Sequence, residues 1–257
     1  MLNSVDLNSD LGESYGSYTI GNDDKIIPLV SSTNVACGFH AADPVVMAET
    51  IEKVKVAKVA IGAHPGLPDL MGFGRRNMSL SSPEAKAYVG YQVAALMGMA
   101  KAQGLNLQHV KPHGALYNMA ATDYQLALAI CQAVKELDEN LIILGLSGSE
   151  MVRAALDLEM KVACEVFADR GYEEDGTLVS RNKDGAFIHD ENAAVARVVR
   201  MVKEGKVKAV TGKDINIQAD SICVHGDGEK ALLFVEKIRA GLAEVGIRIA
   251  PLKEVIQ

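Results

Sequence analysis

Short apolar runs alternate along the chain with longer segments in which apolar residues recur every three or four positions. The short runs predict buried strands, and the longer segments predict amphipathic helices. The predicted strands cover residues 4–8, 30–37, 59–63, 105–110, 141–146, 161–167 and 221–224, and a minor strand outside these seven covers 215–217. The predicted helices cover residues 43–57, 81–104, 123–137, 150–158, 192–205 and 229–245, with a shorter helix that begins near Asp23.

This alternation of strand and helix predicts an α/β fold in which a parallel sheet closes into a TIM-like (β/α) barrel. Seven strands rather than eight predict a distorted barrel or one with a gap. An open doubly wound sheet is the alternative. No linker-like composition divides the chain, so we expect one domain over residues 1–257.

Polar residues gather where the predicted strands end. The first strand leads into DLNSDLGE at residues 6–13, which contains three carboxylates and an amide. Charged groups are costly to bury unless they are paired, hydrogen-bonded or bound to a metal. The same design recurs at residues 34–43, 64–69, 111–118, 165–170 and 225–229. Because the carboxyl ends of barrel strands form the active-site face, we expect an active site there.

Composition excludes several classes of function. The 257 residues are 49% hydrophobic and 23% charged, with a net charge of -7 and no basic run, so we expect no nucleic-acid partner. No apolar run is long enough to span a membrane, and no signal peptide is evident, so we expect a cytoplasmic protein. The four cysteines are widely spaced, which predicts buried thiols rather than a zinc knuckle.

Histidines are the most informative polar residues. Four of the six follow strand ends directly, namely His40, His64, His113 and His225. Imidazoles that converge on a barrel mouth can bind a divalent metal or act as general acids and bases, with Asp10 or Asp6 as the carboxylate. No HExxH spacing is present, so a metal on Asp10, His40 and His64 is one alternative and a metal-free centre is the other.

Lysine and arginine residues also occur at the ends of the predicted strands and in the loops that follow them. Lys111 is either a paired structural cation or a substrate clamp, and arginine offers a fork for carboxylate or phosphate. Arg75 and Arg76 are equally consistent with solvated loop charges. Arg170 stands near Glu165 and Asp169 at a strand end, which favours a role in substrate binding.

Common nucleotide and nucleophile motifs are missing. The sequence has no GxxxxGK[ST] and no GxSxG, so it predicts neither a Walker-type ATP site nor a hydrolase nucleophile elbow. Cys37, three residues before His40, is the remaining candidate nucleophile, and a poor one.

With these residues in hand, the sequence resembles the LamB/YcsF family over essentially its whole length. The resemblance rests on DLNSDLGE at 6–13, NVACGFHAAD at 34–43, GAHPG at 62–66, GFGRR at 72–76, VKPHGALYN at 110–118, EVFADRGY at 165–172 and VHGD at 224–227. It implies a distorted seven-stranded barrel related to polysaccharide deacetylases and some glycoside hydrolases.

The resemblance also implies an activity, that of 5-oxoprolinase. Family members are understood to work with partner subunits B and C to open the lactam of 5-oxo-L-proline to L-glutamate, coupled to hydrolysis of ATP. The implied cofactor is therefore ATP, with or without Mg²⁺. Which of the three subunits binds ATP, and whether this chain holds a transition metal, stay open.

Roles follow from the resemblance as hypotheses. Asp10, His40 and His64 form the polar centre, with Asp10 or one histidine as the base that activates water. Lys111 and His113 stabilise negative charge, and Arg170 or Arg76 clamps the substrate carboxylate. The remaining substrate-binding candidates are Asp6, Asn8, Glu13, Glu165 and His225. Two rival functions are a stand-alone metal-dependent amidase or deacetylase and a non-catalytic partner subunit that binds a small acid.

Overall fold

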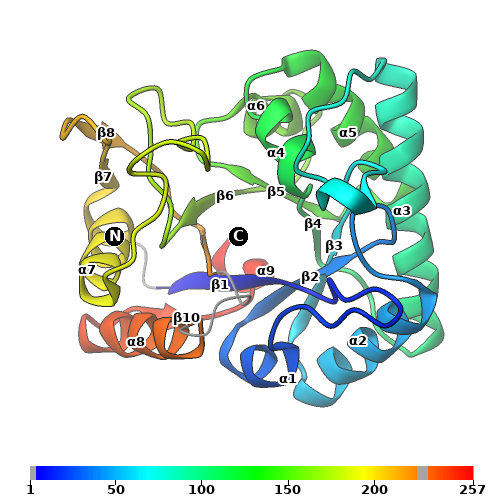
Figure 1. The fold of residues 1–257 in the computed structure, drawn as a ribbon, viewed down its shortest axis with the longest axis horizontal. Coiled ribbons are helices and arrows are strands. Elements are labelled where there is room, and N and C mark those ends of the chain that lie inside the picture. Colours follow the sequence, from blue (N-terminus) through cyan, green and yellow to red (C-terminus); the bar gives the residue numbers. More distant parts are fainter. Residues whose placement is uncertain (1–3, 225–230, 257) are drawn as a thin grey trace.

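The computed structural model describes residues 4–224 and 231–256 and shows a ring of parallel strands surrounded by helices (Figure 1). Within these residues, seven strands form the ring in chain order, and the last pairs with the first. They are β1 (Ser4–Leu11), β2 (Ser32–Ala36), β3 (Ala60–His64), β4 (His109–Val110), β5 (Ile142–Leu146), β6 (Val162–Phe167) and β9 (Ser221–Cys223). The predicted closed barrel is confirmed, and the open-sheet alternative is wrong because β9 pairs with β1.

Helices cover the outside of the barrel and also lie at its ends (Figure 1). They are α1 (Asp23–Ile26), α2 (Pro44–Ala57), α3 (Ser82–Ala102), α4 (Gly114–Ala120), α5 (Tyr124–Leu137), α6 (Glu150–Asp157), α7 (Glu191–Glu204), α8 (Ala231–Glu244) and α9 (Leu252–Val255). Two single turns of 3₁₀ helix are η1 (Ile27–Leu29) and η2 (Leu70–Gly72). No helix in the described part of the chain is both long and apolar enough to cross a bilayer.

Local capping explains where the long helices begin. The Asp43 side chain accepts hydrogen bonds from the amides of Val45 and Val46, and Pro44 occupies the first turn of α2. Ser81 and Glu84 form a reciprocal capping box at the start of α3. Both signals are readable in the sequence, so these two starts were predicted within one residue.

Three predicted details differ from the structure. Strand β4 pairs over two residues only, whereas six were predicted. Helix α4 begins at Gly114, inside 111–118, where the sequence predicts only a polar strand end, and it runs to Ala120. Its start has no side-chain cap, so little local signal predicts it. The predicted minor strand at 215–217 belongs to an antiparallel hairpin of β7 (Lys206–Lys208) and β8 (Asp214–Asn216).

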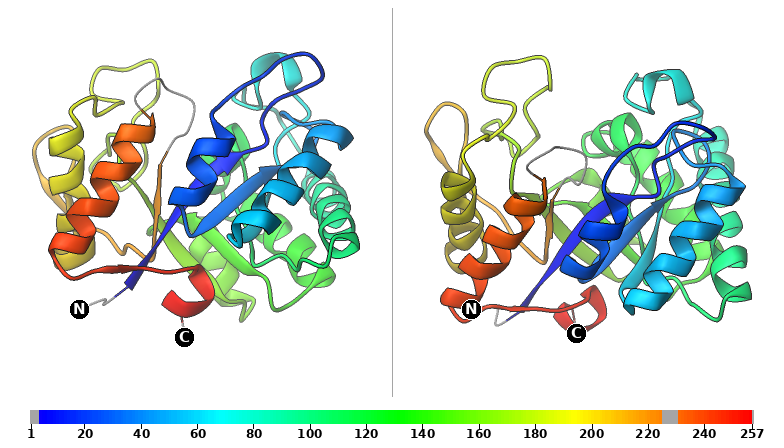
Figure 2. Two further views of the ribbon diagram at one scale, coloured as in Figure 1. Left: turned by 90° about the horizontal axis from the view of Figure 1, so that it is seen from below. Right: turned by 60° about the horizontal axis from the view of Figure 1, so that its bottom comes forward.

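The end of the barrel at which the strands begin is closed by the C-terminal segment (Figure 2). Strand β10 (Arg248–Ile249) pairs with the first residues of β1. Leu252 of α9 is fully buried and packs against inward-facing apolar residues, namely Ile142, Leu144 and Ala163. Loops 12–22, 65–81 and 168–190 rise at the opposite end (Figure 2). Any ligand therefore enters from the carboxyl ends of the strands.

Above this apolar plug, the interior of the barrel becomes polar. Asp6 of β1 is completely buried and accepts hydrogen bonds from the hydroxyls of Ser31, Ser32 and Ser221. Burial raises the pKa of Asp6 to about 6, although the three hydroxyls lower it. The polar ends inferred from the sequence are thus the top of a polar column that begins deep inside the barrel.

Candidate active site

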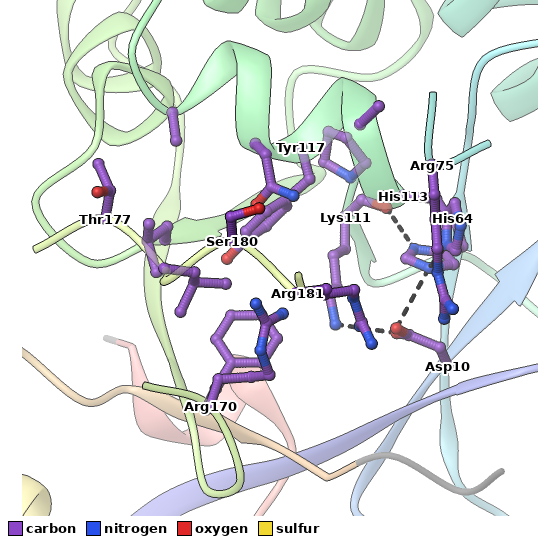
Figure 3. A pocket seen from close by; sticks show the side chains of 18 of the residues that line it. Asp10, His64, Arg75, Lys111, His113, Tyr117, Arg170, Thr177, Ser180 and Arg181 are labelled. Atoms are coloured by element: carbon purple, nitrogen blue, oxygen red, sulfur yellow. Dashed lines mark hydrogen bonds and ion pairs between the residues drawn. The ribbon is translucent and has the colours of Figure 1, made fainter. Parts of the chain in front are cut away.

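The carboxyl ends of the strands surround a cavity of about 710 Å³, a volume suited to a small metabolite. Figure 3 shows polar side chains that reach it from β1 and β3 and from the segments after β4 and β6. The charged and aromatic polar residues that line it include Asp10, Glu13, His64, Arg75, Lys111, His113, Tyr117, Arg170 and Arg181.

Lys111 is a buried cation at the centre of this site. Its Nζ lies 2.9 Å from Asp10 Oδ1 and 2.8 Å from Glu165 Oε1, and 2% of the residue is exposed. Burial alone would lower the pKa of Lys111, but the carboxylates of Asp10 and Glu165 outweigh it and raise that pKa above its usual value. Tyr117 donates its hydroxyl proton to Glu165 Oε2 at 2.6 Å. Lys111 therefore stays charged and holds Asp10 beside the cavity.

Asn8 fixes this ion pair from below. Its side-chain amide donates to Glu165 Oε1 at 3.0 Å and to Ser221 Oγ at 2.7 Å. Its carbonyl oxygen accepts from Asn34 Nδ2 at 2.7 Å and from Lys111 Nζ at 3.3 Å. An asparagine can satisfy several polar neighbours of either kind because it carries both donors and an acceptor. Removing it would take one hydrogen bond from buried polar groups of three strands, β2, β6 and β9.

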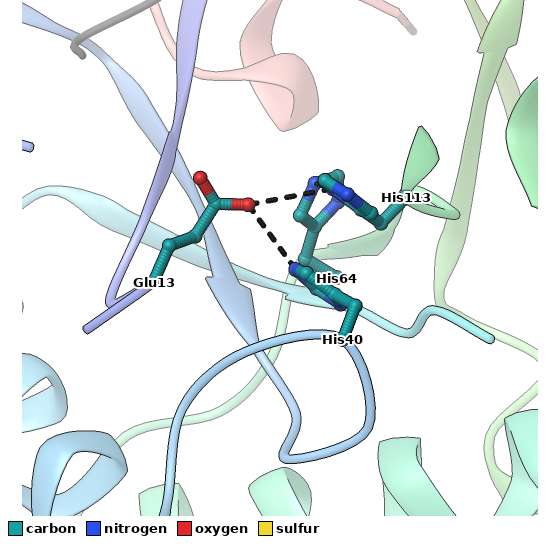
Figure 4. Close-up of side chains that lie close together, drawn as sticks. All are labelled: Glu13, His40, His64 and His113. Atoms are coloured by element: carbon teal, nitrogen blue, oxygen red, sulfur yellow. Dashed lines mark hydrogen bonds and ion pairs between the residues drawn. The ribbon is translucent and has the colours of Figure 1, made fainter. Parts of the chain in front are cut away.

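Three histidines and a glutamate meet beside Asp10 (Figure 4): Glu13, His40, His64 and His113. Each offers one ligand atom, and the four atoms lie within 4.8 Å of one another. Glu13 Oε1 is 3.1 Å from His40 Nε2 and 3.3 Å from His113 Nδ1. His64 Nε2 is 3.0 Å from His113 Nδ1 and 3.4 Å from Asp10 Oδ2. This arrangement of imidazoles and a carboxylate could hold a metal ion.

Main-chain carbonyls determine which ring nitrogens carry protons. His64 Nδ1 lies 2.7 Å from the carbonyl oxygen of Lys111, and His113 Nε2 lies 2.9 Å from that of Phe73. A carbonyl only accepts, so both nitrogens must donate. In the neutral rings, His64 Nε2 and His113 Nδ1 then have no proton and present lone pairs toward the cluster.

Burial favours the neutral forms of His40, His113 and Glu13. The pKa of His113 is well below its usual value because of burial and because His40 and His64 lie next to it. The pKa of His40 is lowered by burial and by His64. Burial also raises the pKa of Glu13, against the opposing effect of His113. Each group is thus shifted toward its neutral form.

Two glycines make room for the histidine stack. The rings of His40 and His113 lie parallel, with centroids 3.6 Å apart and planes 3° apart. A Cβ on Gly74 would lie 2.6 Å from Cβ of His40, and one on Gly66 would lie 2.5 Å from His40 Nδ1. Gly74 also has a φ of +62°, which favours glycine. The glycines of GAHPG and GFGRR therefore allow two loops to pack on this stack.

The chain is similar to known proteins over almost its whole length. A profile of the LamB/YcsF family matches residues 5–257. The chain belongs to the LamB/YcsF family. It is 60% identical to a protein of Clostridium beijerinckii named as the A subunit of 5-oxoprolinase, over 98% of both chains. It is 54% identical to a protein of the same name from Bacillus licheniformis, over 96% of this chain and 98% of the relative.

Solved structures agree with the fold. The lactam utilization protein of Thermus thermophilus is 44% identical, with a TM-score of 0.91 over 96% of this chain and 99% of its own. A family 4 carbohydrate esterase from Streptomyces lividans has a TM-score of 0.50 at 11% identity, over 97% of this chain and 93% of its own. The barrel of this LamB/YcsF protein therefore has the same overall fold as that esterase.

The predicted site residues of this LamB/YcsF protein line the cavity, lie beneath it or lie beside it. Asp10, Glu13, His64, Lys111, His113 and Arg170 line the cavity. Asp6, Asn8 and Glu165 are fully buried beneath it, and His40 is buried beside His113. His225 lies outside the described residues. Asp6 is connected to the cavity only through other side chains, so a direct role in substrate binding stays a prediction.

The arginines of GFGRR are placed differently from each other. Arg76 is paired with Asp69, the cap of η2, and does not line the cavity, whereas its neighbour Arg75 does. Arg170 is held by the carbonyl oxygens of Ala186 and Val179, at 3.1 Å from Nε and 2.6 Å from Nη2. Arg76, and not Arg75, is the candidate clamp predicted from the sequence, and only the loop conformation shows that Arg75 is the one that lines the cavity.

Some residues near the site were not singled out from the sequence. Tyr117 lines the cavity, and its position in the VKPHGALYN motif was the available signal. His109 does not follow a strand end, and it lies in the barrel wall with Nε2 2.6 Å from Asn34 Oδ1. All four cysteines are buried as predicted, and burial raises the pKa of Cys37 to about 12, which makes it a weak nucleophile.

Proposed function

We propose that this chain is the A subunit of an ATP-dependent 5-oxoprolinase in the cytoplasm. It acts with subunits B and C to open the lactam of 5-oxo-L-proline to L-glutamate, with hydrolysis of ATP to ADP and phosphate. The observation that carries this proposal is full-length similarity, up to 60% identity, to curated proteins of that name. The cavity, with carboxylates and imidazoles facing cations, has the groups that such a reaction needs.

The chemistry explains the need for ATP. A five-membered lactam is a stable amide, so its carbonyl oxygen must be activated, for example by phosphorylation, before water can attack. Water adds to the carbonyl carbon, the C–N bond breaks, and the ring nitrogen leaves as the amine of glutamate after taking up a proton. A base must remove a proton from the water, and positive charge must stabilise the oxyanion.

The residues of the cavity fit these roles. Asp10 and His64, 3.4 Å apart, are the candidate bases. Lys111, which stays charged, stabilises negative charge on the carbonyl oxygen or on a phosphate. His113 was predicted to share this role, but in its neutral form it presents a lone pair to the cluster and would stabilise negative charge only after taking up a proton. The guanidinium groups that line the cavity belong to Arg75, Arg170 and Arg181, and they are the candidates for the substrate carboxylate.

A second function is favoured by the Glu13 and histidine cluster. A metal-dependent amidase or deacetylase would activate water on an ion and would need no ATP. A non-catalytic small-acid-binding subunit is the third candidate. It would leave the assembled complex active when Asp10 or His64 is replaced.

One assay separates the three. Release of glutamate and ADP is measured with 5-oxo-L-proline for this chain alone, for the complete mixture with subunits B and C, and for mixtures lacking one component. The proposal predicts turnover only in the complete mixture with ATP, lost with Asp10→Asn or His64→Ala but kept with the surface variant His189→Ala. Turnover by this chain without ATP would favour the amidase. Full turnover with Asp10→Asn would support the non-catalytic subunit.

A further inference from the structure

We propose that Glu13, His64 and His113, with His40 as the fourth ligand, bind one divalent transition-metal ion at the mouth of the barrel. The proposal concerns binding and does not depend on the reaction assigned above. The ligand atoms are Glu13 Oε1, His40 Nε2, His64 Nε2 and His113 Nδ1. They lie at the carboxyl ends of β1, β2, β3 and β4, which are neighbours in the sheet, so the pairing of these strands brings them together.

The protonation of the rings is the first argument. The carbonyl oxygens of Lys111 and Phe73 take the N–H groups of His64 and His113, so the remaining two nitrogens face each other as lone pairs at 3.0 Å. Two lone pairs at that distance repel, and a cation that both can coordinate removes the repulsion. Metal-bound histidines almost always donate their other N–H to a carbonyl or carboxylate, and this pair does so twice.

The distances give the second argument. Ligands about 2.05 Å from a tetrahedral zinc ion lie about 3.3 Å apart. The separations between ligand atoms are 3.0 Å for His64 and His113, 3.3 Å for His113 and Glu13, and 3.1 Å for His40 and Glu13. Nδ1 of His40 is buried without a hydrogen-bond partner, so its ring has less support than the other two. The His40 ring also lies parallel to that of His113, with centroids 3.6 Å apart, so it must turn before the in-plane lone pairs of both rings can reach one ion. The four ligand atoms lie within 4.8 Å of one another, so binding must draw them closer together. We therefore assign His40 the weakest of the four bonds.

The surroundings of Glu13 give the third argument. Lys111 pairs with Asp10 and Glu165, whereas Glu13 Oε1 contacts the imidazoles of His40 and His113. A buried carboxylate is unfavourable unless a positive charge lies beside it. A divalent ion held between these groups would stabilise the ionised form of Glu13. Imidazole with a carboxylate favours zinc, cobalt or nickel over magnesium or calcium.

The alternative is a metal-free site in which His64 carries a second proton. Its Nε2–H would then donate to the lone pair of His113 Nδ1. Elemental analysis of the purified full-length chain distinguishes the metal-bound site from the metal-free one. After dialysis against a chelator, the protein is titrated with Co²⁺ by visible absorption and with Zn²⁺ by calorimetry. We expect one ion per chain and the intense d–d bands of four-coordinate cobalt.

Three variants and one control test the ligand assignment. His64→Ala, His113→Ala and Glu13→Gln should each weaken Zn²⁺ binding by about 100-fold or more. His189→Ala changes an exposed histidine outside the cluster and should leave binding unchanged. Circular dichroism of the metal-free proteins shows whether each variant folds. If an alanine variant does not fold, Glu13→Gln, which keeps the side-chain shape, tests the ligand assignment in its place. No saturable binding to the wild type, or equal affinity in Glu13→Gln, would overturn the proposal. Metal binding by a protein that fails the glutamate assay would refute only the proposed reaction.

Discussion

Asp6 gives the most direct quantitative test of the polar column. It is completely buried, and its pKa rises from the usual 3.8 to about 6 because burial disfavours the carboxylate. At about 1.4 kcal/mol per pKa unit, keeping Asp6 ionised in the folded protein costs about 3 kcal/mol. Solvent does not screen the Asp6 carboxylate, because the residue is completely buried.

The sign of the pH effect follows from proton binding. Between pH 4 and pH 6, the folded protein keeps the proton of Asp6 while the unfolded chain has lost it, so stability falls as pH rises through this window. Asp6→Asn cannot ionise and escapes this loss. The free energy of unfolding of Asp6→Asn minus that of the wild type should therefore increase by about 2 kcal/mol from pH 4 to pH 7, since part of the roughly 3 kcal/mol is already lost at pH 4.

The measurement is urea denaturation followed by far-ultraviolet circular dichroism, since the chain contains no tryptophan. Other titrating groups are shared by both proteins, so the difference isolates Asp6. Asp184→Asn, at an exposed carboxylate, is the matched control and should give a difference that does not vary with pH. A flat difference for Asp6→Asn over the same range would refute the assignment of a raised pKa to this buried carboxyl.

Three further predictions concern the mouth of the barrel. Lys111→Met leaves two buried carboxylates without their cation and should lower the free energy of unfolding by about 3–5 kcal/mol at pH 8, measured by urea denaturation; a loss below about 1 kcal/mol would contradict the ion-pair network. Arg75→Ala should raise KM for 5-oxo-L-proline about tenfold in the complete subunit mixture, whereas Arg76→Ala should leave KM unchanged; the reverse order would show that the cavity assignment is wrong. Gly74→Ala, at φ +62° and with its Cβ 2.6 Å from that of His40, should lower stability by roughly 1–3 kcal/mol in thermal unfolding, and an unchanged Tm would contradict the close packing.

Local features of this protein were determined by the sequence itself. Apolar runs and helical spacing located the barrel strands and the long helices, because those signals depend on neighbours a few residues apart. The caps at Asp43 and Ser81 are local in the same sense. The polar residues after the strands showed where a site would lie, because parallel strands in a barrel present their carboxyl ends on one face.

Tertiary structure decided how those residues meet. The order in which the strands pair around the ring brings Glu165 within 2.8 Å of Lys111 and Glu13 within 3.3 Å of His113. The sequence separation of such pairs contains no information on their distance. Loop conformation likewise turned Arg75 rather than Arg76 toward the cavity. Main-chain carbonyls then set the ring protonation of the histidines, which depends on backbone positions in three dimensions and not on residue type.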